Sequence, residues 1–109
     1  MPTPAESAEA HWQTLDLAEQ LGNIGSEISR ALNWRAKDEA DKSAHAFERG
    51  LELFDFTLAD ARWRGRLKEL ARAREVVCDY FAGTNAYGSS PSSLRSYFDL
   101  FALAARKNK

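Results

Sequence analysis

Apolar residues recur every three or four positions through most of the chain, and polar runs separate the recurring groups. This spacing places the apolar side chains on one face of a helix. In the first part of the chain the recurring residues are Leu21, Ile24, Ile28 and Leu32. Thr3 and Pro4 suit the cap and the first turn of a helix, and the polar run 37–42 marks its end. We therefore predict a helix from Pro4 to about residue 36, with a break near Gln13–Thr14 as an alternative because Thr14 can also cap.

Two more helical stripes follow. The first consists of Phe47, Leu51, Phe54 and Leu58, with Leu53 and Phe56 outside it. Asp60 suits the cap of the next helix, which Gly83 ends. The apolar stripe of that helix consists of Trp63, Leu67, Leu70, Val77 and Phe81. A break at Asp60 is favoured over one continuous helix of about 40 residues, because helices of that length are rare in small domains.

The last helix begins at Ser90–Pro91, after a loop over residues 83–89. Its apolar side carries Leu94, Tyr97, Phe98, Phe101, Ala104 and Ala105. No segment alternates apolar and polar residues as a strand would. The pattern predicts an all-α fold, an antiparallel four-helix bundle formed by residues 1–109 as a single domain.

Composition narrows the class of protein. Apolar residues make up 44% of the 109 residues, which excludes an intrinsically disordered chain. Cys78 is the one cysteine and has no partner for an internal disulfide. The first residues lack the basic and apolar segments of a secretory signal, and no apolar run is long enough to span a membrane. We expect a cytoplasmic protein without a membrane interaction.

Charge divides the chain into two unequal parts. Residues 1–60 carry five Lys and Arg against twelve Asp and Glu, and residues 61–109 carry ten against four. The net charges are therefore −7 and +6. The excess of cations is concentrated in residues 62–74, the first part of the predicted third helix. Such an uneven surface is typical of a protein that meets an anionic surface, either in a partner or in its own acidic helices.

Binding of RNA or DNA is one interpretation of this basic segment. Arginine and lysine would contact phosphates, and Trp63 between Arg62 and Arg64 could stack on a base. The predicted nucleic-acid-binding residues are Arg62, Trp63, Arg64, Arg66, Lys68, Arg72 and, less surely, Arg74. The other interpretation is that the basic helix packs beside an acidic helix of the same chain or of another copy. Both interpretations stay open at this point.

A small-residue surface lies on the first predicted helix. Gly22, Gly25 and Ser26 share this surface, and two glycines within a helix favour a close crossing with another helix. Trp12 and Trp34 lie outside the main apolar stripe, and aromatic residues in such places often mark oligomer contacts. We therefore predict that these five residues serve helix packing or a subunit interface.

The same helix carries a family resemblance. The segment from Ile24 to Ala31, Ile-Gly-Ser-Glu-Ile-Ser-Arg-Ala, resembles a helix signature of the four-helix-bundle proteins encoded in ribosomal-RNA intervening sequences. That superfamily includes the accessory proteins of diversity-generating retroelements, which assemble as pentamers and present a basic surface to nucleic acid and reverse transcriptase. The whole chain also resembles small helical proteins of bacteria, which supplies no function. The resemblance implies homo-oligomerisation and association with nucleic acid.

Catalytic patterns are not found in the sequence. Neither His11 nor His45 follows a glutamate by three residues, as a bundle di-metal centre requires. No serine lies in a nucleophile elbow, and the glycines form no phosphate loop. We expect no enzyme, cofactor or metal, but a homo-oligomeric accessory module that binds nucleic acid through its basic helix. The alternative is a protein-interaction or self-assembly module in which acidic and basic helices pair between subunits.

Overall fold

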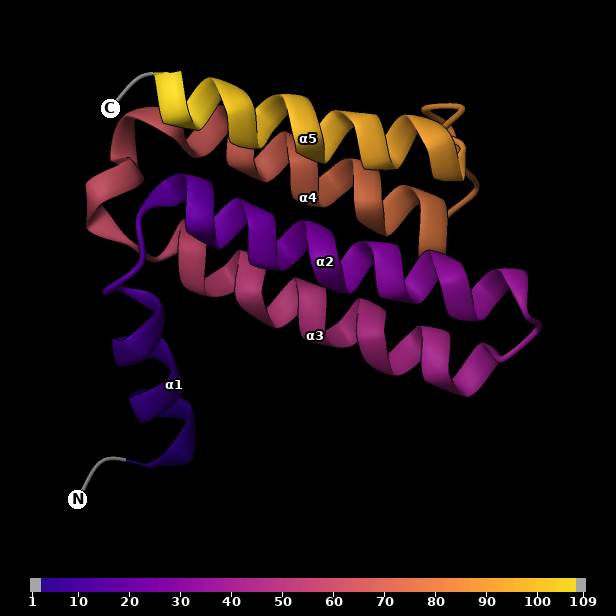
Figure 1. Cartoon of the computed structure of the whole chain (residues 1–109), viewed down its shortest axis with the longest axis horizontal. Helices are drawn as coiled ribbons and strands as arrows, with labels where there is room; N and C mark the ends of the chain where they lie inside the picture. The colour runs from indigo at the N-terminus through magenta and orange to yellow at the C-terminus, as the bar shows by residue number, and fades with distance from the viewer. Residues whose placement is uncertain (1–2, 108–109) are drawn as a thin grey trace.

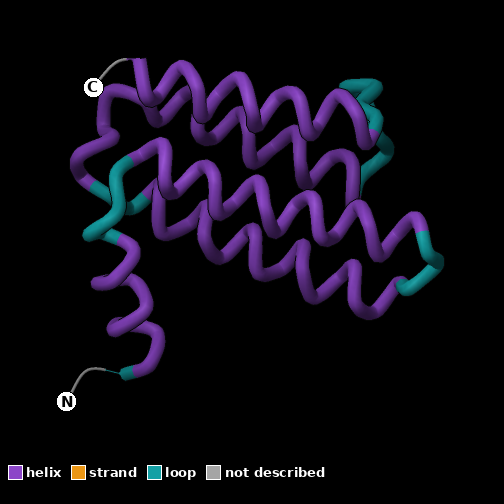
Figure 2. Tube along the Cα trace, in the orientation of Figure 1, coloured by secondary structure: helices purple, strands orange, loops and turns teal. Residues whose placement is uncertain are grey.

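The chain folds into five α-helices and one 3₁₀ helix in the computed structural model, which describes residues 3–107 without the side chains of residues 4–6 (Figure 1). The elements are α1 (Pro4–Trp12), α2 (Leu17–Ala36), α3 (Ala40–Leu58), the 3₁₀ helix η1 (Ala61–Arg66), α4 (Leu67–Ala82) and α5 (Pro91–Lys107). Residues 3–107 contain no strand, and short loops join the helices (Figure 2). The all-α prediction is confirmed. The number of helices is larger than predicted, because the segment before residue 37 forms two.

The molecule measures 38 × 35 × 19 Å along its principal axes. The four longer helices run back and forth beside one another, and α1 projects away from them at one end (Figure 1). The helix α2 packs against both α3 and α5, and α4 packs against α3. The backbones of α4 and α5 approach each other much less closely than these pairs do. Within residues 3–107, no helix is both long and apolar enough to cross a lipid bilayer.

The core lies where α2 meets its neighbours. Leu21, Ile24 and Ile28 of α2 are almost completely buried, as their spacing predicts. On α3, however, Leu53 is buried although it lies outside the predicted stripe, and Leu51 is only partly buried. The cause is Gly50, which faces α2 so closely that a Cβ there would stand 2.9 Å from Ile28 Cδ1. This contact sets the face of α3 that is buried.

Local chemistry accounts for the starts of α1, α2 and α5, whereas α3 and α4 begin without a side-chain cap. Pro4 and Pro91 begin α1 and α5, as predicted. The chain does break after Trp12, but Asp16 and not Thr14 caps α2. The Asp16 carboxylate accepts from the Glu19 backbone N–H at 2.8 Å, and the Glu19 side chain accepts from the Asp16 N–H at 3.3 Å. This reciprocal pair satisfies two of the backbone donors that a helix start leaves open.

The basic segment does not begin as an α-helix. Asp60 caps it, as predicted, but residues 61–66 form the 3₁₀ helix η1, with a kink at Trp63 (φ −102°, ψ 21°). The predicted α-helix from Asp60 onward would rotate about 100° per residue. Since a 3₁₀ helix turns about 120° per residue, the side chains before Leu67 point in other directions than predicted. Leu67 itself is 40% exposed and is not part of the buried stripe.

Candidate functional site

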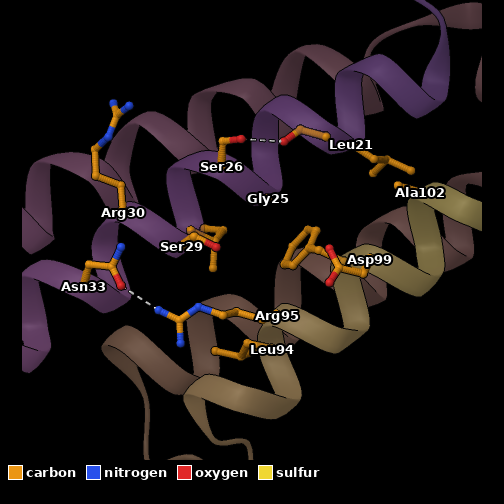
Figure 3. A pocket seen from close by; sticks show the side chains of 13 residues that line it. Leu21, Gly25, Ser26, Ser29, Arg30, Asn33, Leu94, Arg95, Asp99 and Ala102 are labelled. Atoms are coloured by element: carbon orange, nitrogen blue, oxygen red, sulfur yellow. Dashed lines mark hydrogen bonds between the residues drawn. The ribbon is translucent and has the colours of Figure 1, made fainter.

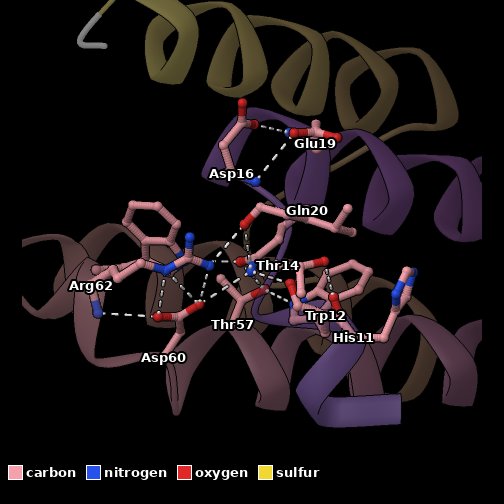
Figure 4. A network of polar contacts seen from close by, with 11 residues as sticks. His11, Trp12, Thr14, Asp16, Glu19, Gln20, Thr57, Asp60 and Arg62 are labelled. Atoms are coloured by element: carbon pink, nitrogen blue, oxygen red, sulfur yellow. Dashed lines mark hydrogen bonds and ion pairs between the residues drawn. The ribbon is translucent and has the colours of Figure 1, made fainter. Parts of the chain in front are cut away.

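A buried polar network holds the start of the basic segment against the rest of the molecule (Figure 4). The Asp60 carboxylate, only 4% exposed, accepts from Arg62 Nε at 3.0 Å and from Arg62 Nη2 at 2.7 Å. The same Nη2 donates to the Leu15 carbonyl at 2.7 Å. Hydrogen bonds from Arg62 lower the pKa of Asp60 against the opposing effect of burial, so that the carboxylate stays ionised at neutral pH. Arg62 therefore neutralises a charge of its own chain.

Gln20 lies at the centre of this network and is completely buried. Its amide Nε2 donates to the Trp12 carbonyl at 3.0 Å and to Asp60 Oδ2 at 3.3 Å. Its amide oxygen accepts from Thr57 Oγ1 at 3.0 Å and from Trp63 Nε1 at 2.9 Å, and Thr57 in turn accepts from Trp12 Nε1 at 2.8 Å. Both tryptophan rings are thus fixed by hydrogen bonds that they donate to α2 and α3.

These contacts determine how far the predicted site residues Trp63 and Trp12 are exposed. Trp63 is half-buried against the core, with the Arg62 guanidinium 4.4 Å from its ring centroid. Trp12 is buried in its own chain and does not lie on an outer surface. Trp12 connects α1 with α2 and α3, and Trp63 connects η1 with α2. The indole N–H of each residue donates a hydrogen bond within the chain.

The remaining cations of the basic segment differ in how far they are neutralised. Arg74 Nε pairs with Asp55 of α3 at 3.0 Å, so acidic and basic helices of one chain do pair at this point. Arg66 pairs with Glu69 at 3.0 Å and Arg72 with Glu75 at 3.8 Å, both within α4 and its start. No hydrogen bond or ion pair joins the side chain of Arg64 or Lys68 to any residue in the part of the chain that the structure describes. Four cations of the segment are exposed, namely Arg62, Arg64, Lys68 and Arg72, and of these Arg64 and Lys68 have no acidic partner among the described residues.

Three of the basic residues line an open groove between α4 and α5. The groove has a volume of about 690 Å³. One wall is formed by α5, and the other by residues 66–72. The α5 wall consists of Tyr97, Leu100, Phe101 and Ala104, and the opposite wall of Arg66, Lys68, Glu69 and Arg72. An apolar wall thus faces a wall with three cations and one carboxylate.

The α5 wall has the pattern of a helix face that packs against another helix. Tyr97, Leu100, Phe101 and Ala104 stand at positions i, i+3, i+4 and i+7, the usual spacing of a core-facing stripe. Yet Leu100 is 66% exposed. Burial raises the pKa of the Tyr97 hydroxyl, which therefore stays neutral at physiological pH. The wall presents no charge of its own.

Leu100, which lines the groove, is one of a few large apolar side chains that are exposed. Within residues 3–107 there are four, all between residues 67 and 103: Leu67, Tyr87, Leu100 and Leu103. Single exposed leucines are ordinary on a soluble protein, but several on adjoining turns mark an interaction surface. Arg66 and Arg72 lie over the apolar edge, at 5.8 Å from the Phe101 ring centroid and 5.9 Å from that of Tyr87.

The predicted small-residue surface lies elsewhere, between α2 and α5 (Figure 3). At Gly25 the helices α2 and α5 approach each other closely, because a Cβ there would stand 3.3 Å from Phe98 Cβ. Gly22 has no atom within 4 Å of such a Cβ, and Ser26 donates to the Gly22 carbonyl at 3.0 Å. Gly22 and Ser26 line a hollow of about 380 Å³. Arg95 and Asn33 also line it, and the Arg95 guanidinium donates a hydrogen bond of 2.7 Å to the Asn33 side chain.

Trp34 lies on the far part of α2. Its half-buried ring has Lys42 Nζ at 4.4 Å and Lys37 Nζ at 5.4 Å from its centroid. Both lysines lie within cation–π range of the ring, and both belong to the same chain as Trp34. The structure does not bring Trp34 together with Trp12 or Trp63, so the three tryptophans form no common stacking surface.

Two observations concern the chemistry of the thiol and of possible metal ligands. Burial raises the pKa of the Cys78 thiol, which disfavours a reactive thiolate. No three His, Cys, Asp or Glu side chains gather as metal ligands within residues 3–107. No family model, curated protein or solved structure matches the chain.

The groove is the feature that sequence reasoning missed. The predicted stripe of the last helix included Tyr97, Phe101 and Ala104 but assigned them to the core. One signal could have revealed the groove: Leu100 and Leu103 widen the apolar arc of α5 beyond what one neighbouring helix covers. Leu94, Phe98 and Ala105 are the residues that α5 buries in the core.

Proposed function

We propose that this chain is a non-enzymatic protein-interaction module that binds its partner in the groove between α4 and α5. The observation that carries the proposal is the uncovered stripe of α5, in which Leu100 is 66% exposed although its neighbours follow a core-facing pattern. Burying apolar surface contributes about 25 cal/mol per Å². A helix laid along this stripe would therefore gain most of its binding free energy from apolar contact.

A neutral amphipathic peptide tests this function. The probe is a fluorescein-labelled 14-residue helical peptide with leucines at i, i+3, i+4 and i+7 and glutamines elsewhere, titrated with the protein and followed by fluorescence anisotropy. We expect saturable binding that Leu100→Glu abolishes and Leu100→Met retains. Equal binding by the wild-type protein and Leu100→Glu would reject the groove as the interaction surface, provided that circular dichroism shows both folded.

Self-assembly is one form that this function can take. Two identical α4/α5 faces would bring Arg66, Lys68 and Arg72 of both copies together, which like-charge repulsion disfavours. A homo-oligomer would therefore be head-to-tail, with the basic face of one copy beside the exposed acidic residues Glu48 and Glu52 of the next. Sedimentation velocity at 50 and 500 mM NaCl tests this form. An oligomer that dissociates in high salt supports it, and a single-chain mass at every protein concentration rejects it.

Nucleic-acid binding is the second candidate function. It is supported by Arg64 and Lys68, the cations of the basic segment that no acidic residue neutralises. Reversal of Arg62 is not a suitable test, since it would place a second carboxylate against Asp60. The suitable variant is Arg64→Glu/Lys68→Glu. If phosphates bind there, the affinity for RNA or DNA falls steeply with salt, and the variant reduces the slope of log K against log salt by about 2. Absence of binding in 50 mM salt would reject this function.

A further inference from the structure

The two walls of the α4/α5 groove differ in chemistry, and this difference specifies its occupant. The α5 wall is apolar from Tyr97 to Ala104, and the α4 wall carries Lys68 and Arg72 beside a single carboxylate, Glu69. A molecule that fills the groove touches both walls at once. It therefore needs an apolar face toward α5 and negative charge toward α4.

We infer that the groove binds an acidic amphipathic helix of another protein. This inference rests on the proposed function and names the chemistry of the partner. The apolar stripe spans seven residue steps, about 10 Å along the axis of α5 at 1.5 Å per residue. An occupant of two to three helical turns matches that length. Its apolar residues lie at i, i+3 or i+4, and i+7, and its Asp and Glu side chains lie on the flank that faces α4.

Within the described residues, neither α3 nor α5 of a second copy supplies such a helix. The acidic helix α3 exposes Glu48, Glu52 and Asp55, but its large apolar residues Leu53 and Phe54 are buried in its own core. The helix α5 exposes apolar residues but ends in Arg106 and Lys107. Neither helix combines an exposed apolar stripe with an acidic flank.

The phosphate backbone of a nucleic acid fits the groove less well than this helix. It would neutralise Lys68 and Arg72 but leave the apolar wall of Leu100 and Phe101 uncovered. The cations also lie at the edge of the groove and retain contact with water, where charge steers association and sets partner choice more than it adds affinity. Apolar contact then provides the affinity, and charge provides the specificity.

Three labelled peptides with one apolar stripe test the inference. Their polar flank carries glutamine, glutamate or lysine, and their binding to the full chain is measured by fluorescence anisotropy at 50 and 500 mM NaCl. We expect the glutamate peptide to bind at least about tenfold more tightly than the lysine peptide at low salt, which is about 1.4 kcal/mol. The difference should shrink at high salt because screening weakens exposed charge pairs.

Charge reversal of the α4 wall provides the decisive variant. Lys68→Glu/Arg72→Glu should invert the order, so that the lysine peptide binds more tightly than the glutamate peptide. The matched control, Lys37→Glu/Lys42→Glu, reverses two cations beside Trp34 and should leave the order unchanged. Circular dichroism verifies that each variant is folded.

The outcomes separate this inference from the function on which it rests. If all three peptides bind equally and Leu100→Glu abolishes their binding, the groove is the interaction surface but the acidic partner is wrong. If Leu100→Glu leaves peptide binding unchanged, the proposed function fails as well. A 20-nucleotide single strand that binds tightly, while the glutamate peptide does not bind, would overturn the inference in favour of nucleic acid.

Discussion

Asp60 holds several neighbouring groups at once through hydrogen bonds. Its carboxylate caps η1 through the Arg62 backbone N–H at 3.1 Å and also holds the Arg62 guanidinium and the Gln20 amide. A carboxyl whose pKa is lowered by folding stabilises the fold above its unfolded-state pKa of about 3.9. That contribution is lost as pH falls below this value and through the lowered folded-state pKa.

We therefore predict that Asp60→Asn lowers the free energy of unfolding at pH 7 by about 1–3 kcal/mol, because an amide leaves buried donors without an anionic acceptor. The difference between wild type and variant should become smaller between about pH 4 and pH 2. Urea denaturation at pH 7, 4 and 2 measures both effects. Asp99→Asn, at an exposed position on α5, serves as the control. Equal stabilities of wild type and Asp60→Asn at pH 7 would show that the network contributes nothing.

At the scale of elements, the start of α2 shows which side chain caps the helix. Asp16 forms a reciprocal cap with Glu19, whereas Thr14 donates its hydroxyl to the His11 carbonyl at 2.6 Å. We predict that Asp16→Ala lowers the free energy of unfolding by about 1 kcal/mol, the usual effect of losing an N-cap. Thr14→Ala should have a smaller effect, since its carbonyl partner also accepts the Thr14 N–H. Chemical denaturation compares the two, and the reverse order would contradict the assigned cap.

The two glycines of α2 provide a second prediction at this scale. Gly22→Ala should raise the free energy of unfolding by about 0.5–1 kcal/mol, because alanine favours the helix and a Cβ there meets no atom. Gly25→Ala should gain less or lose stability, since its Cβ would press on Phe98 at 3.3 Å. Thermal and urea denaturation of both variants measure this difference. Equal gains at the two positions would mean that α2 and α5 are not held closely at Gly25.

The elements also show what the sequence can and cannot predict. Asp60, Gly83 and Pro91 mark helix ends through local chemistry, and the structure agrees at each of them. The exposure of Leu67 and the burial of Leu53 depend on which helix lies opposite, and no local pattern contains that information. The internal role of Arg62 likewise depends on Leu15 and Gln20, which lie more than 40 residues away in the sequence. Long-range polar contacts thus hold the side chains of two predicted site residues, Arg62 and Trp63, in hydrogen bonds within their own chain.

At the scale of the whole molecule, the closely packed helix α2 contrasts with the partly uncovered helix α5. The helix α2 packs against both α3 and α5, while α4 and α5 leave the groove between them. Residues 24–32 of α2 include Ile24, Ile28 and Ala31, which are at most 1% exposed. Beyond Phe98, by contrast, Leu100, Leu103 and Ala104 of α5 face water. Stability against local opening should follow this difference, since segments with little buried apolar contact open with the least free energy.

We predict that the backbone amides of residues 100–107 exchange with deuterium at least about tenfold faster than those of residues 24–32, by native-state hydrogen exchange at pH 7. The first turns of α5, around the buried Leu94, provide the internal control and should be intermediate. Uniform protection of α2 and α5 would mean that the open edge is as stable as the core. If slow exchange is confined to α2 and its neighbours, the uncovered stripe of α5 is the part of the fold that a bound helix would stabilise most, so partner binding should be detectable there as a loss of exchange.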